Sequence, residues 1–162
     1  MLAYNYYDTD QTGFAELDIE GEHYLELLEI CFYYCASFSW RIRGKGVTEP
    51  GNICQFQIPV TSNVVNAYSH FYHQDSKLWI DEVRHYKIVP ETIRAFRSVT
   101  DSIFKWINGW GNCNPEDPIF YRKDGSVFFS SVIHEGKCTL LPNSGEDVNE
   151  IFKYGNWVKC EV

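Results

Sequence analysis

The chain has 162 residues, a net charge of −8 and 17 % aromatic residues. This length fits one domain, residues 1–162, with room for a sizeable core, and the aromatic content argues against disorder. The acidic balance and the lack of a basic stripe argue against a nucleic-acid-binding protein. We find neither a secretory signal nor a membrane-spanning apolar run, so we expect a cytoplasmic protein that does not bind membranes.

The first 40 residues carry the whole net charge. They contain eight acidic residues and no lysine or arginine, which leaves 14 of the 22 acidic residues to balance the 14 basic ones. Residues 1–7 are predicted to form an edge strand or an ordered arm, and residues 8–13 a loop. The charged segment that follows is the most informative for function.

From Asp18 to about Tyr34 the spacing predicts an amphipathic helix. One face is acidic: Asp18, Glu22, Glu26 and Glu29. The opposite face is apolar: Tyr24, Leu27, Leu28, Cys31 and Cys35. Like charges four residues apart repel, so helix stability alone does not explain this pattern. The acidic face is either a solvated surface or a docking surface for a basic partner. As partner-binding residues we predict Asp18, Glu20, Glu22, Tyr24, Glu26 and Glu29.

The middle of the chain alternates between predicted strands and helices. Apolar residues at every second position in Phe32–Arg43 predict a strand with one buried face. Strands are also expected over Ile53–Val60 and Leu78–Val89. A short helix should start at Thr61 or Ser62 and bury Val64, Val65, Tyr68, Phe71 and Tyr72. The clearest helix begins at Pro90, continues through Ile103 and Ile107, and stops at Gly109.

After a rigid loop over Trp110–Pro118, the segment Ile119–Leu141 predicts a three-stranded antiparallel meander. Its turns are expected at Asp124-Gly125, as a two-residue type I′ turn, and at Glu135-Gly136. The expected cross-strand pairs are Lys123–Ser126, Tyr121–Phe128, Phe120–Phe129 and Ile133–Cys138. A short helix from Ser144 and a strand over Trp157–Val162 complete the chain. The fold class is therefore α+β, a mainly antiparallel sheet with about three packed helices.

Six cysteines without a CxxC motif are interpreted as reduced, mostly buried residues. A sharper alternative is a metal site that combines Cys31 and Cys35 with His70 and His73. An enzyme is another alternative, with His134 and Glu135 at a strand end and Cys54 or Cys113 as nucleophile. We predict neither: no metal, no cofactor and no catalytic residues.

The sequence PEDPIFYRKDGSVFFSSVIHEGKCTL, about residues 115–141, resembles small bacterial proteins encoded in toxin–immunity loci. The shared pattern is a P-E-D step, an aromatic strand, R-x-D-G-S and a strand that ends in His-Glu. The resemblance implies a cytosolic immunity protein that binds and blocks a toxin of a polymorphic-toxin or contact-dependent inhibition system, and it implies no catalytic residues. Many such toxins are nucleases, which need basic surfaces to hold phosphates.

We therefore predict a small acidic binding protein, not an enzyme, that neutralises a basic toxin by direct contact. A phage-encoded inhibitor of a bacterial defence nuclease stays open as an alternative, because it would be equally small, acidic and aromatic-rich. An oligomerising subunit is a further alternative, and the oligomeric state is left open.

Overall fold

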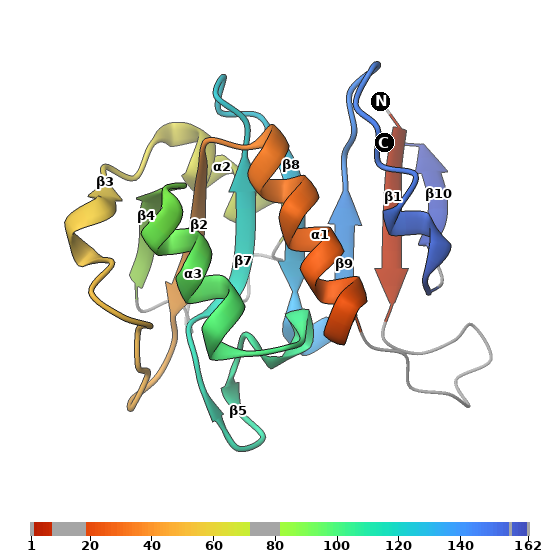
Figure 1. Ribbon diagram of the computed structural model, residues 1–162. Coiled ribbons are helices and arrows are strands. Elements are labelled where there is room, and N and C mark those ends of the chain that lie inside the picture. Colours follow the sequence, from red (N-terminus) through yellow and green to blue (C-terminus); the bar gives the residue numbers. More distant parts are fainter. Residues whose placement is uncertain (1, 8–18, 72–81, 156, 162) are drawn as a thin grey trace.

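The computed structural model describes residues 2–7, 19–71, 82–155 and 157–161. Eight strands form one sheet in the order β10-β1-β9-β8-β7-β2-β4-β3, and every neighbouring pair is antiparallel. Two helices cover the near face of this sheet in Figure 1, and a third lies behind it. The α+β class and the mainly antiparallel sheet are thus confirmed.

The elements have the following bounds. The strands of the large sheet are β1 (Leu2–Tyr7), β2 (Ser37–Ile42), β3 (Gln57–Ile58), β4 (Glu82–Lys87), β7 (Glu116–Tyr121), β8 (Val127–Val132), β9 (Lys137–Leu140) and β10 (Trp157–Glu161). A small hairpin is made by β5 (Asn108–Gly109) and β6 (Asn112–Cys113). The α-helices are α1 (Gly21–Tyr34), α2 (Ser62–Phe71) and α3 (Pro90–Val99). Short 3₁₀ turns are η1 (Cys54–Phe56), η3 (Ile103–Lys105), η4 (Ile133–Glu135) and η5 (Ile151–Lys153).

The predicted meander is present as β7, β8 and β9, but only part of its register is as expected. Phe120 pairs with Phe129, as predicted. Tyr121 pairs with Val127 instead of Phe128, because a bulge inserts one extra residue into β8. A classic bulge turns neighbouring side chains toward the same face, and both Phe128 and Phe129 belong to the core cluster beneath α1.

Both predicted turns exist, with different geometry. The Arg122 N–H donates to the Ser126 carbonyl and the Gly125 N–H donates to the Arg122 carbonyl, each at 2.9 Å. Gly125 has φ +85° whereas Asp124 has no positive φ. This is a three-residue loop with a left-handed glycine, and the predicted type I′ turn is wrong, as is its Lys123–Ser126 pair. At the second turn Ile133 lies in η4, so Cys138 pairs with Ser131 and not with Ile133.

The two faces of the sheet are covered by different helices. On the near face, α1 and α3 pack on rings from alternate strand positions, among them Phe38, Trp40 and Phe120. On the far face, Val64 and Tyr68 of α2 pack on a second cluster with Ile119, Tyr121 and Val132. The prediction of one buried face for the second strand is therefore wrong. Ser39 and Arg41, expected in solvent, are 0 % and 2 % exposed.

Three further predictions need correction. The third helix ends at Val99, because Thr100 is extended and the Ser102 hydroxyl accepts from the Phe104 N–H to start η3. The first strand is not at the edge, because β10 pairs with its outer side. The strand predicted over Ile53–Val60 is only the two residues of β3, and the predicted final helix is only the turn η5. The segment predicted as a rigid loop instead contains part of a small hairpin and the start of β7.

Candidate functional site

The solvent-facing side of α1 is the candidate partner-binding surface. The helix forms because Tyr24, Leu27, Leu28 and Cys31 recur at helical spacing and are all buried, as predicted. The opposite side presents four exposed residues, which we call the α1 ridge: Glu22, Leu25, Glu29 and Tyr33. Successive members are three or four positions apart, so their side chains are neighbours along one line.

The α1 ridge combines carboxylates with large apolar groups. Leu25 is 43 % exposed and Tyr33 is 81 % exposed. Tyr33 contacts only the edge of Tyr34 among its described ring neighbours, with centroids 4.9 Å apart. Protein interfaces are enriched in tyrosine at their buried core and carry polar residues at their rim.

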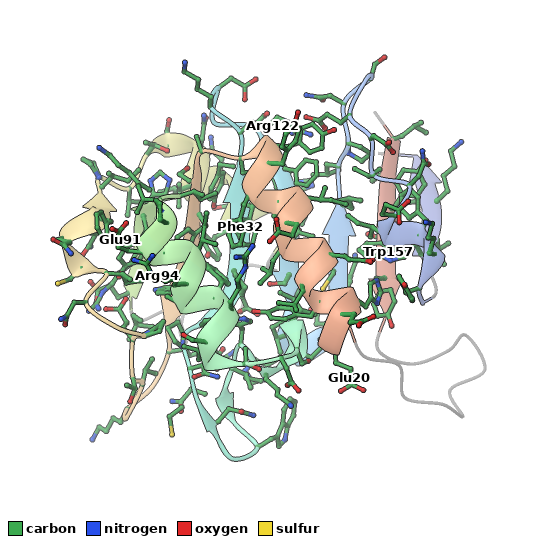
Figure 2. All side chains as sticks on the ribbon, in the orientation of Figure 1. Glu20, Phe32, Glu91, Arg94, Arg122 and Trp157 are labelled. Carbon is green, nitrogen blue, oxygen red and sulfur yellow. The ribbon has the colours of Figure 1, made fainter. Side chains whose placement is uncertain are left out.

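The predicted acidic residues occupy different environments. Glu20 and Glu22 are exposed. Glu20 lies at the N-terminal end of α1, with its side chain directed away from the helix (Figure 2). Among the described residues, no ion pair joins either of them to a basic side chain. Glu29 is exposed and pairs with Arg97 of α3. Glu26 is half-buried, with one carboxylate oxygen shielded from solvent. Asp18 lies outside the described residues.

Tyr24 does not belong to this surface, and its predicted partner-binding role is wrong. Its side chain is 0 % exposed. The hydroxyl donates to the Phe96 carbonyl at 3.0 Å and accepts from the Trp106 indole N–H at 2.9 Å. Burial raises the pKa of the Tyr24 hydroxyl above its ordinary value. Tyr24 is a satisfied core residue that joins α1 to α3.

The alternative enzymatic site around His134 is not assembled as expected. His134 Nε2 lies 3.2 Å from a carboxylate oxygen of Glu116, and the ring lies 5.9 Å from that of Trp110. Glu135 is exposed on the neighbouring position. Neither Cys54 nor Cys113 is among the described contacts of His134, and both thiols are exposed. The imidazole is therefore paired with a strand glutamate.

The alternative metal site is also not assembled. Cys31 and Cys35 are buried at α1 on one face of the sheet, whereas His70 belongs to α2 on the other face. His73 lies outside the described residues. In the ranges that the structure describes, no group of three histidine, cysteine, aspartate or glutamate side chains could hold a metal ion.

Sequence reasoning missed a layer of buried polar groups beneath α2. Ser37, Ser39 and Arg41 point to this face from β2, and His85 joins them from β4. Arg41 pairs with Asp117, whose other carboxylate oxygen accepts from the Ile133 N–H at 2.8 Å. In the sequence these polar residues of β2 alternate with Phe38 and Trp40. The alternation predicted exposed side chains, because α2 was not expected to cover them.

Comparison with known proteins adds no assignment: no family model, no curated protein and no solved structure matches the chain. Of the helices that the structure describes, none has the length and apolar character needed to cross a membrane.

Proposed function

We propose that this chain is a small acidic binding protein that neutralises a bacterial toxin, most simply a basic nuclease, by direct contact through the α1 ridge. One observation carries the proposal: an exposed helix face holds Glu22, Glu29, Leu25 and Tyr33 and includes no basic residue. No disulfide joins any of the six cysteines, all of which belong to the described residues, and this suits the reducing cytoplasm that the proposal assumes.

Charge gives this surface its selectivity. A one-signed acidic patch accelerates encounter with a basic partner and disfavours acidic ones. Arginine and lysine side chains that hold phosphates in a nuclease can instead form charge-assisted hydrogen bonds with Glu22 and Glu29. Once these basic side chains bind the carboxylates, they could no longer bind the phosphates of the nucleic acid.

The ion pair between Glu29 and Arg97 does not prevent such contacts. The two side chains are 60 % and 44 % exposed. Exposed pairs of this kind contribute about 0–1 kcal/mol, so exchange of Arg97 for a partner's arginine costs little.

Apolar contacts supply the rest of the affinity. Leu25 lies between the two carboxylates along the helix, and Tyr33 lies one turn beyond Glu29. Both side chains are exposed, so binding would mainly remove water from their apolar surface. Burial of a tyrosine at the centre of an interface is a typical anchor, worth on the order of 1 kcal/mol or more, and burial of the leucine adds its apolar area. The ridge therefore has both a steering and an anchoring component.

The test begins with co-expression of this chain with the protein encoded next to it, followed by affinity purification on a tag. A salt-sensitive complex with a basic protein is expected. The double charge reversal Glu22→Lys with Glu29→Lys should then weaken the affinity by roughly 10- to 100-fold and reduce its salt dependence. Glu26 is left unchanged, because its shielded oxygen makes a lysine there a threat to folding.

Glu135→Lys is the control, because Glu135 is an exposed glutamate of η4 and is not a member of the α1 ridge. It should leave the affinity nearly unchanged. Tyr33→Ala should weaken binding without changing the salt dependence. Equal affinity of the double reversal and the natural chain would refute the proposed surface.

A further inference from the structure

A cleft of about 370 Å³ opens on the far face of the sheet, between the start of α2 and the turn that joins β7 to β8. Its walls include Ser37, Thr61, Asn63, His85, Tyr121 and Lys123. A neighbouring cleft of about 510 Å³ shares Asn63 and the turn residues and adds apolar walls from Ala67, Phe71, Val127 and Leu141. Both volumes lie near the range of small-molecule sites.

Ser37 and His85 form a hydrogen-bonded pair in the wall of the smaller cleft. The Ser37 Oγ lies 2.8 Å from His85 Nε2. The other ring nitrogen, Nδ1, lies 2.9 Å from the Pro59 carbonyl oxygen. A carbonyl oxygen can only accept, so Nδ1 carries the proton. Nε2 is then free to accept, and the Ser37 hydroxyl donates to it.

This arrangement is that of an activated serine. A nucleophilic serine needs a base within hydrogen-bond reach and a third group that orients the base. Here His85 is the base and the Pro59 carbonyl holds its tautomer. Burial lowers the pKa of His85, although the Pro59 carbonyl opposes part of that change. The imidazole is therefore neutral at pH 7, as a general base must be.

The fold holds both side chains rigidly. β2 and β4 pair with Ser39 opposite His85, which places Ser37 two residues along on the same face. The His85 ring also packs edge-on against Tyr121, with centroids 5.6 Å apart. Ser37 and His85 are 8 % and 5 % exposed, so the cleft is their route to solvent. Such fixed rotamers are what a preorganised site requires.

The surroundings favour developing negative charge. Thr61 to Val64, at the start of the ten-residue helix α2, line the same cleft. First-turn N–H groups and the helix dipole stabilise anions. Lys123 lies in the same wall and adds a positive charge, next to the Asp124 carboxylate, which accepts from the Ser126 N–H and hydroxyl. These groups suit the oxyanion that forms when a serine attacks a carbonyl carbon.

We propose that Ser37 and His85 are a nucleophile and general base that hydrolyse a short carboxylic ester bound in this cleft. Ser37 Oγ bonds to the ester carbonyl carbon as its proton passes to His85 Nε2. The bond to the alcohol oxygen then breaks, and that oxygen takes the proton from Nε2. Water attacks the acyl-serine, gives a proton to Nε2, and releases the carboxylic acid as Ser37 recovers its proton.

The first test treats the full folded chain with a serine-directed fluorophosphonate and maps the adduct by peptide mass spectrometry. A covalent adduct on Ser37, lost after heat unfolding and in His85→Ala, is expected. This readout needs no Ser37 variant, so a folding defect in such a variant cannot obscure it. Absence of an adduct on Ser37 in the folded natural chain overturns the proposal.

The second test measures hydrolysis of p-nitrophenyl acetate and butyrate after the exposed thiols are blocked with iodoacetamide. Ser37→Ala should lower the rate at least about 100-fold. Ser39→Ala is the matched control, because Ser39 is also a buried serine of β2 but bonds to the Tyr68 and Tyr121 hydroxyls. The natural chain should gain activity as pH rises, with a midpoint below the ordinary histidine value of 6.5. Equal rates for the natural chain and Ser37→Ala overturn the proposal.

Discussion

Replacement of Arg122 with methionine is expected to lower the free energy of unfolding by about 3 kcal/mol, because this side chain joins the meander to the segment that follows it. Its guanidinium makes a bidentate pair with Glu146, with both N–O distances at 2.7 Å. It also donates to the Leu141 carbonyl at 2.6 Å and the Val127 carbonyl at 2.8 Å. In Figure 2 Arg122 lies at the end of the sheet beside the last turn of α1.

The magnitude follows from the burial of this pair. The side chains of Arg122 and Glu146 are 9 % and 13 % exposed, so solvent screens the interaction little. Loss of one partner of a buried ion pair typically costs about 3–5 kcal/mol. Glu146 retains some access to water, which places the estimate at the low end. Lysine keeps the charge but not the fork of donors, so Arg122→Lys should cost about half as much.

Urea denaturation followed by far-ultraviolet circular dichroism measures these differences at constant m value. Arg94→Met is the control, because that side chain is 68 % exposed and its contact with Glu91 is 3.8 Å long. It should stay within about 0.5 kcal/mol of the natural chain. A loss of less than about 1 kcal/mol for Arg122→Met would refute the view that the Arg122 network holds the meander together.

Two further predictions concern strain and pH. Trp110 has φ +49° in the two-residue turn between β5 and β6, and its side chain is 77 % exposed. Because asparagine tolerates positive φ better than tryptophan, Trp110→Asn should stabilise the chain by roughly 0.5–1 kcal/mol and raise the melting temperature. A lower melting temperature would mean that the contact between Trp110 and His134 outweighs the strain. Hydrogen bonds from Arg122 lower the pKa of Glu146 below its ordinary value of 4.5. Because the folded-state pKa is the lower one, this stabilisation is complete above pH 4.5 and is lost as pH falls through the folded value. The stability difference between the natural chain and Glu146→Gln should therefore shrink below pH 4.5 and stay constant above it, as measured by urea denaturation across pH.

Local spacing was enough to predict the helix of the acidic region and the strands of the meander. The apolar positions of α1, from Tyr24 to Cys31, are buried because helical periodicity alone decides which side faces the sheet. The same periodicity contradicted the choice of Tyr24 as a partner-binding residue. A tyrosine that shares a face with Leu27 and Leu28 belongs to the core, and its nearness in sequence to glutamates carries no information.

Contacts between distant segments could not be predicted in the same way. Ser37 and His85 are 48 residues apart, and their pairing depends on the register of β2 with β4. The burial of this pair depends on α2, which covers the far face of the sheet. Nothing in the local sequence of β2 or β4 indicates that a helix packs there. A polar residue on an alternating strand can therefore face solvent or lie in a buried polar layer. Only the packing of a third element over that face decides which of the two occurs.

The R-x-D-G-S and P-E-D patterns of the sequence are accounted for by contacts that build the fold. In R-x-D-G-S, Asp124 Oδ1 accepts from the Ser126 N–H at 2.9 Å and from its hydroxyl at 2.7 Å, while Gly125 takes the left-handed position. In P-E-D, Asp117 has φ +56° and is held by Arg41 and the Ile133 N–H. These residues stabilise the turns and ends of the meander strands, so the function has to be tested at surfaces outside the two patterns.

The two proposed surfaces can be tested independently, because the sheet lies between them. The α1 ridge belongs to the near face, and the cleft with Ser37 and His85 lies beneath α2 on the far face. Charge reversal at Glu22 and Glu29 should weaken partner binding while the fluorophosphonate still labels Ser37. Conversely, Ser37→Ala should abolish labelling and leave partner affinity unchanged. Joint loss of both properties in either variant would instead indicate a folding defect, which the urea titration would reveal as a lowered midpoint at unchanged m value.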